Sequence, residues 1–217
     1  MHPHQPLDAA LEARLSRLPK AELHFHFEGA FRWRTIRELP PDGNALPERD
    51  PWLNCARPFA DFQDFSQVFR DYIQPATGTS EAIERHAFEM LADLAQQNVR
   101  YVEILLSPKF HMMLGLTKEQ VWRAAVAGCR HAMAQFDIEA RLFLGLSRVQ
   151  PPAQALQALE EIAAFALPRA WISGIDLQGD ERCGENRAFV DVYKRAERAG
   201  CRVSVRRAGY FPRRARH

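Results

Sequence analysis

Apolar and polar residues alternate strictly over residues 21–27. Leu23, Phe25 and Phe27 fall on one side of this pattern, and Glu22, His24 and His26 fall on the other. A period of two predicts a strand whose two faces meet different surroundings. A short helix is expected before it, because apolar residues recur at helical spacing over residues 7–18 and Pro19 interrupts the pattern.

Helical and strand patterns alternate along the rest of the chain. They begin after a proline-rich stretch at residues 39–58, which is typical of a functional loop. Helices are predicted over residues 59–73, 80–97, 117–136, 153–167 and 186–199. Further strands are predicted over residues 99–107, 138–147, 171–176 and 202–205. Such alternation indicates a parallel sheet built from βα units.

Five βα units fit either a doubly wound sheet or the first part of an eight-stranded barrel, whose usual length is roughly 250 residues. The chain has no Gly-x-Gly-x-x-Gly after its first strand and no Gly-x-x-x-x-Gly-Lys-[Ser/Thr]. Phosphate-cradling loops are therefore missing, which favours the barrel. We predict an α/β fold: an incomplete TIM-type (β/α) barrel, with about five of the eight parallel strands and their surrounding helices.

The charge of the chain is unevenly distributed. Its 217 residues carry a formal net charge of +2, but six arginines and no acidic residue lie within residues 202–217. The remaining 201 residues hold 23 basic and 27 acidic side chains, so the body is mildly acidic. We therefore predict two parts, a barrel segment at 1–205 and an arginine-rich tail at 206–217. Nucleic-acid binding is not expected of the folded part, although the tail leaves a nucleic-acid arm as an alternative.

Neither a membrane segment nor a secretory signal is visible in the sequence. The apolar runs are only a few residues long, and the first residues lack the basic and apolar regions of a signal peptide. The four cysteines are far apart in the sequence and suggest reduced thiols. A cytoplasmic location is expected.

His24 and His26 project from the same face at the carboxyl end of the first predicted strand. Two imidazoles in that position can converge on one metal ion, and this is the end of the strand where barrel enzymes place their sites. By itself, His-x-His also fits two histidines on a solvated strand face.

Two other segments are candidates for ligand binding. The loop at 174–181 contains two glycines and three carboxylates after a predicted strand, which suits a close approach to a ligand or an ordinary helix-capping turn. Phe62, Phe65 and Phe69 form a stripe at helical spacing. Such a stripe is usually core, but after a long loop it also fits a lid that shields a flat aromatic ligand.

These motifs resemble the adenosine/adenine deaminase family, a group of metal-dependent amidohydrolase-type barrels. The resemblance rests on Leu-Pro-Lys-Ala-Glu-Leu-His-Phe-His-Phe-Glu-Gly-Ala at 18–30, on Tyr-Val-Glu-Ile-Leu-Leu-Ser-Pro at 101–108, and on Gly-Ile-Asp-Leu-Gln-Gly-Asp-Glu at 174–181. It implies one Zn²⁺ ion and the hydrolysis of an aminopurine to its 6-oxo product and ammonia. By this resemblance His24 and His26 are zinc ligands. The substrate-binding residues that it implies are Glu28, Phe62, Phe65, Phe69, Ser107 and Gly179.

The sequence departs from the family near its end. Family members carry a third histidine and a proton-donating glutamate in a His-Ala-Gly-Glu motif, whereas this chain reads Arg-Arg-Ala-Gly-Tyr at 206–210. We therefore expect a truncated, inactive form with no catalytic residue of its own. The change to arginine-rich sequence at Arg206 suggests a reading-frame change or a premature stop.

Two further expectations follow from the resemblance. One alternative function is a half-barrel that binds or scaffolds a full-length relative, with oligomerisation or aggregation through its open edges. Glu28 stands where adenosine deaminases usually have aspartate, which favours adenine or a modified adenosine such as aminodeoxyfutalosine as the substrate.

Overall fold

A computed structural model describes residues 8–40, 46–51, 59–165, 171–179 and 183–204 of the chain. The chain forms two compact units, residues 1–142 and 143–217. The arginine-rich tail at 206–217 and residues 41–45 and 52–58 of the predicted loop lie outside the described residues.

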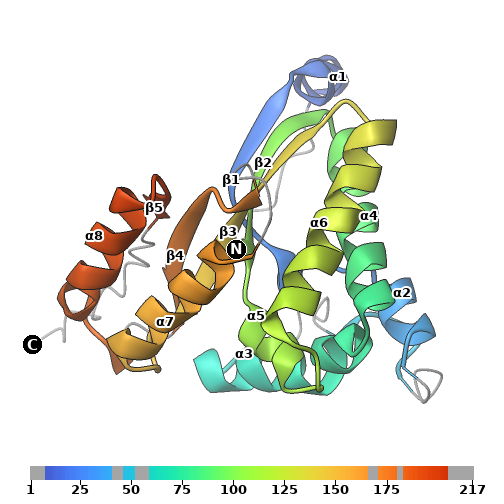
Figure 1. Cartoon of the computed structure of the whole chain (residues 1–217). Coiled ribbons are helices and arrows are strands. Elements are labelled where there is room, and N and C mark those ends of the chain that lie inside the picture. The colour runs from blue at the N-terminus through green and yellow to red at the C-terminus, as the bar shows by residue number, and fades with distance from the viewer. Residues whose placement is uncertain (1–7, 41–45, 52–58, 166–170, 180–182, 205–217) are drawn as a thin grey trace, which may run out of the picture. The chain divides into compact units, whose positions relative to one another are not determined.

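The first unit contains two complete strands and most of the helices (Figure 1). Its elements are α1 (Ala9–Arg17), β1 (Lys20–His26), the 3-10 turn η1 (Phe27–Gly29), α2 (Trp33–Glu38), α3 (Phe62–Val68), the π-helical turn η4 (Phe69–Ile73), the 3-10 turn η5 (Gln74–Thr77), α4 (Ser80–Gln96), β2 (Val99–Leu106), α5 (Pro108–Met112), α6 (Lys118–Gln135) and the start of β3 (Glu139–Ser147).

The core of this unit lies between its strands and two long helices. β1 and β2 pair in parallel, with His26 opposite Leu105. α4 and α6 lie side by side (Figure 1) and bury Trp122 completely. Both helices start where the sequence supplies a cap, because the hydroxyl groups of Thr79 and Thr117 accept hydrogen bonds from backbone amides of the first helical turn.

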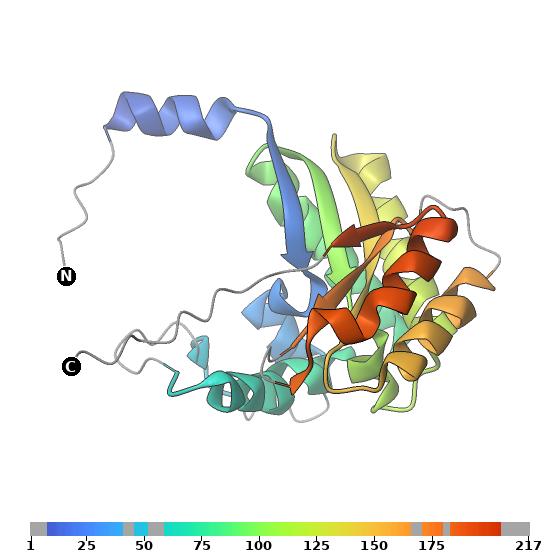
Figure 2. The same cartoon turned by 90° about the vertical axis from the view of Figure 1, so that its left-hand side faces the viewer.

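The second unit continues the βα pattern. It holds the rest of β3, then α7 (Pro152–Ala163), β4 (Gly174–Gln178), the 3-10 turn η8 (Asn186–Phe189), α8 (Val190–Arg198) and β5 (Arg202–Ser204). β4 pairs in parallel with β3 on one side and with β5 on the other. α7 and α8 lie beside each other, as both views show (Figures 1 and 2).

The hydrogen bonds place the five strands in chain order, from β1 to β5. This arrangement confirms the predicted succession of βα units. The helix predicted over residues 59–73 is instead α3 followed by the π-helical turn η4, and α2 and α5 lie where no helix was predicted. None of the described helices is long and apolar enough to span a membrane.

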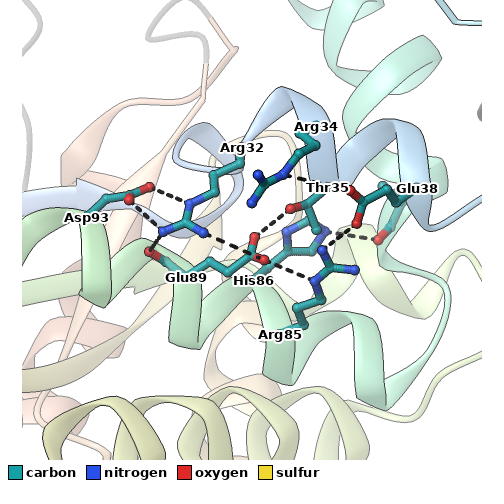
Figure 3. A network of polar contacts seen from close by, with 9 residues as sticks. Arg32, Arg34, Thr35, Glu38, Arg85, His86, Glu89 and Asp93 are labelled. Carbon is teal, nitrogen blue, oxygen red and sulfur yellow. Dashed lines mark hydrogen bonds and ion pairs between the residues drawn. The ribbon is translucent and has the colours of Figure 1, made fainter. Parts of the chain in front are cut away.

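Charged side chains join α2 to α4 in a network at the surface (Figure 3). The Arg32 guanidinium donates to both carboxylate oxygens of Asp93, at 2.9 and 2.6 Å. Arg85 donates to Glu38 at 2.5 Å and to Glu89 at 3.0 Å. The hydrogen bond from Arg85 holds the pKa of the Glu38 carboxyl below its ordinary value. The network therefore fixes the position of α2, which follows the end of β1.

Beneath these charges lie two buried polar residues. The Thr35 hydroxyl donates to Glu89 Oε2 at 2.5 Å. The His86 ring is only 1% exposed, with its Nε2 atom 3.1 Å from the Ala76 carbonyl oxygen and Phe31 stacked on it at a centroid distance of 3.8 Å. Burial lowers the pKa of His86 to about 4, so the ring is neutral near pH 7.

Candidate functional site

His24 and His26 lie together at the carboxyl end of β1. Their ring centroids are 5.0 Å apart and the ring planes meet at 78°. Both residues are partly buried, whereas Glu22, earlier on the strand, is exposed. The strand geometry therefore brings the two predicted ligands side by side, as their spacing in the sequence implied.

The opposite face of β1 differs from the prediction at its start. Phe27, in the turn after the strand, is completely buried, but Leu23 is 59% exposed. The pairing of β1 with β2 is irregular between Glu22 and Phe25, so the strand departs from strict alternation there. Alternation in the sequence also carries no information on whether another element covers a strand face.

Glu28 occupies a buried position just beyond the two histidines. Its side chain is in the 3-10 turn η1 and only 5% of the residue is exposed. Its Oε1 atom accepts a hydrogen bond from the Ser107 backbone amide at 2.9 Å, which brings together two of the residues that the resemblance implied. The Nε2 atom of His111 lies 3.2 Å from the same oxygen.

His111 was not predicted to take part in the site. It lies in α5, directly after β2, and is 1% exposed. A single histidine four residues after Ser107 has no pattern of its own. The available signal was its position beyond the carboxyl end of a strand, where barrel enzymes place functional residues.

The three phenylalanines do not share one environment. Phe62 is 43% exposed and Phe65 is 50% exposed, so these two are not core residues. Phe69 begins the π-helical turn, and its ring lies 4.7 Å from that of Phe110 in α5. The π-helical turn begins only at Phe69, so it is the exposure of Phe62 and Phe65 that argues against the core interpretation. The exposed rings fit the lid interpretation, which stays a prediction.

In the second unit, Gly174 and Gly179 have different roles. A Cβ atom on Gly174 would lie 2.3 Å from the ring of Phe143, so this glycine is required for packing rather than for a ligand. Gly179 has a φ of 104°, a backbone conformation that suits glycine. It ends β4 and exposes its backbone at that point, while Asp180 and Glu181 lie outside the described residues.

Arg148 anchors the segment that follows Gly179. Its backbone amide donates to the Gln178 carbonyl oxygen at 2.9 Å. Its guanidinium donates to the Gly184 carbonyl oxygen at 3.2 Å and to the Asn186 side chain. Arg148 is itself buried, so it ties both ends of the loop after β4 to the end of β3. The sequence analysis did not single out this arginine.

The described residues do not by themselves form a catalytic zinc site. Such sites have three protein ligands and a water molecule. In the described ranges no cluster of three or more His, Cys, Asp or Glu side chains is arranged to hold a metal ion. His24 and His26 account for two ligands at most.

Comparison with known protein sequences shows which family the chain belongs to. The sequence model of the adenosine deaminase family matches residues 19–211. The chain belongs to the adenosine deaminase family. The adenosine deaminase of Vibrio vulnificus (strain YJ016) is 31% identical over 195 residues, which are 87% of this chain and 58% of that protein. The adenosine deaminase of Clostridium botulinum (strain Hall) is 29% identical over 194 residues, covering 87% of this chain and 57% of the other.

Two solved structures agree with this chain in fold. A cog1816 amidohydrolase from Burkhoderia ambifaria, solved with bound Zn, has a TM-score of 0.78 and 27% identity over 94% of this chain and 56% of its own. The adenine deaminase of Arthrobacter aurescens has a TM-score of 0.72 and 24% identity over 86% of this chain and 57% of its own.

These relatives confirm the predicted incomplete TIM-type barrel. The chain spans somewhat over half the length of the relatives that it matches.

Proposed function

We propose that the chain carries the first part of a zinc-dependent purine deaminase site. The reaction of this lineage adds water to an aminopurine and releases ammonia, leaving the 6-oxo purine. His24 and His26 are the two zinc ligands that this part contributes. The observation that carries the proposal is that two neighbouring imidazoles at the end of β1 are followed, two residues further along the chain, by a buried carboxylate, Glu28.

The other site residues have roles in binding the substrate. Glu28, held by the Ser107 amide, provides a fixed hydrogen-bond acceptor. The exposed rings of Phe62 and Phe65, with Phe69, shield a flat purine from water. The backbone of Gly179, which has no side chain to obstruct it, contacts the base. Glu28 in place of aspartate favours adenine or a modified adenosine over adenosine itself.

We further propose that this chain alone does not turn over purines. A catalytic zinc needs a third protein ligand, and the described residues bring together only two. The location proposed for the chain is the cytoplasm. The domain boundary proposed near residue 205 separates the barrel segment from the arginine-rich tail.

Zinc binding and purine turnover test the proposal separately. Purified chain titrated with zinc is expected to bind the ion weakly, and a His24→Ala/His26→Ala double variant is expected to lose that binding. His131→Ala, which removes an exposed histidine from α6, is the matched control and retains it. Unchanged zinc binding in the double variant would remove the basis of the proposed metal site. Ammonia release from adenine or adenosine by the zinc-loaded chain would contradict the proposed lack of turnover.

A second candidate function is a half-barrel that pairs with a full-length relative. It is favoured by exposed apolar side chains on α1, just after it and on β1, which is an edge strand among the strands that the structure describes; Figure 2 shows α1 standing apart from the strands. These side chains are Leu11, Leu15, Leu18 and Leu23. Light scattering distinguishes the two candidates, because a defined complex with a full-length relative supports pairing and a monomer in its presence argues against it.

A further inference from the structure

The buried contact between Glu28 and His111 connects the turn η1 and the helix α5, which follow the neighbouring strands β1 and β2. Glu28 comes directly after β1, and His111 lies in α5, directly after β2. The two residues are 5% and 1% exposed, and Nε2 of His111 is 3.2 Å from Oε1 of Glu28. The Phe27 and His111 rings are in a T-shaped arrangement at a centroid distance of 6.0 Å, so an aromatic side chain lies beside the contact.

The hydrogen bonds around Glu28 show which atom donates. Oε1 already accepts the Ser107 amide proton at 2.9 Å. An ionised carboxylate has only acceptor oxygens, so with Glu28 in that form the His111 ring donates to it through Nε2–H. The Ser107 amide and the His111 ring, both after β2, therefore hold one carboxylate oxygen of Glu28 in a single place. Because a carboxylate offers about four acceptor positions, acceptor capacity remains for another donor.

His111 is placed at a cost to stability. Its other ring nitrogen, Nδ1, is buried and has no hydrogen-bond partner among the residues that the structure describes. A buried polar atom without a partner lowers the free energy of unfolding. A leucine of similar volume would fill this site without that cost. Stability alone therefore does not account for a histidine here, whereas its bond to Glu28 does.

We propose that His111 is a positioning residue that holds the Glu28 carboxylate ready to accept a hydrogen bond from the purine substrate. This inference rests on the proposed function. The substrate must then present a donor to Glu28, either a ring N–H of a free base or a hydroxyl group of a ribose. His111 does not touch the substrate in this arrangement and acts only through Glu28.

Two substitutions at His111 separate positioning from packing. His111→Gln keeps an N–H donor at a similar reach, and His111→Leu keeps the volume without a donor. We expect the dissociation constant for adenine, measured by calorimetry on the zinc-supplemented chain, to rise about tenfold in His111→Leu, as loss of a bond to a charged group implies. His111→Gln is expected to stay close to the wild type. His131→Leu, a change of the same kind outside the site, is the control.

Three ligands distinguish the two donor sources. The ligands are adenine, which has a ring N–H at position 9, 9-methyladenine, which lacks it, and adenosine, which has ribose hydroxyl groups instead. If adenosine binds and 9-methyladenine does not, the donor in the nucleoside is a ribose hydroxyl group. If adenine alone binds, the donor is the ring N–H. Equal affinity of all three purines in the wild type, or equal weakening by His111→Leu and His111→Gln, overturns the inference. Unchanged affinity for both adenine and adenosine in His111→Leu overturns it as well.

A measurement without ligand separates failure of this inference from failure of the proposed function. Nitrogen-15 NMR of the His111 ring is expected to show a proton on Nε2 that exchanges slowly with water and shifts when Glu28 is replaced by glutamine. That signature in a chain that binds none of the purines supports the contact but refutes purine binding, and with it the proposed function. A proton on Nδ1 instead refutes the positioning role, whatever the chain binds.

Discussion

Acid is expected to destabilise the first unit through His86. The ring is 1% exposed, its Nε2 atom faces the Ala76 carbonyl oxygen, and Phe31 covers one side. Burial is the largest cause of its low pKa; Arg85 and His111 lower the pKa further, while the Ala76 carbonyl and Glu89 raise it. Protonation therefore favours the unfolded chain, in which the ring is solvated.

The size of the effect follows from the two pKa values. The folded value is about 4 and the unfolded value is 6.5, and each pH unit between them corresponds to about 1.4 kcal/mol. The contribution of neutral His86 to the free energy of unfolding is fully present above pH 6.5. It is lost progressively as the pH falls to about 4, with a total loss of about 3 kcal/mol.

Urea unfolding followed by circular dichroism across this pH range measures the loss. His86→Gln retains an N–H donor for the Ala76 carbonyl oxygen but does not titrate. We expect the free energy of unfolding to fall by about 3 kcal/mol more in the wild type than in this variant. Because both proteins contain the same carboxylates, their protonation cancels in the difference. His131→Gln is expected to follow the wild type. Parallel curves for the wild type and His86→Gln would refute the reasoning.

Three further substitutions test the packing and the surface. Thr35→Val removes the buried hydroxyl that donates to Glu89 and is expected to lower the free energy of unfolding by about 1–3 kcal/mol, measured by urea unfolding. Gly174→Ala places a methyl group against the ring of Phe143 and is expected to lower the melting temperature, with a cost of about 1–3 kcal/mol. Leu23→Lys is expected to reduce self-association in light scattering, because it charges an exposed apolar side chain on an edge strand.

Each of these substitutions has a matched control on the same chain. Thr117→Ser keeps a capping hydroxyl in α6 and is expected to leave stability nearly unchanged. Gly78→Ala adds a methyl group that meets only ordinary contacts, the nearest at 3.8 Å. Val149→Lys charges an exposed residue of the second unit and is expected to leave self-association unchanged. Stabilities of Thr35→Val and Gly174→Ala equal to the wild type, or unaltered association of Leu23→Lys, would contradict these interpretations.

Much of the fold could be predicted because local signals agreed with one another. The helix beginning at Ser80 has both a capping threonine and a regular apolar spacing, and its predicted end differs from the observed one by a single residue. α2 was missed because it has only six residues and no side-chain cap. α5, with five residues, was missed for the same reason.

The candidate site was predictable only in part. The spacing of His24 and His26 is enough to place both on one strand face, and the structure brings their rings together. The contact of Glu28 with His111 joins residues 83 positions apart, which no local pattern can reveal. The exposure of Leu23 likewise depends on which elements surround β1 rather than on its own sequence.

The π-helical turn at Phe69–Ile73 has a consequence for how this region tolerates change. A π turn holds one residue more than the α-helical repeat, and successive α-helical residues are about 100° apart around the axis. Deleting one residue from the turn would re-phase the helix and rotate the rings of Phe62 and Phe65 by about that angle relative to Phe110. The orientation of the exposed Phe62 and Phe65 rings therefore depends on the number of residues in this turn. An insertion or deletion there would change this orientation more than any point substitution.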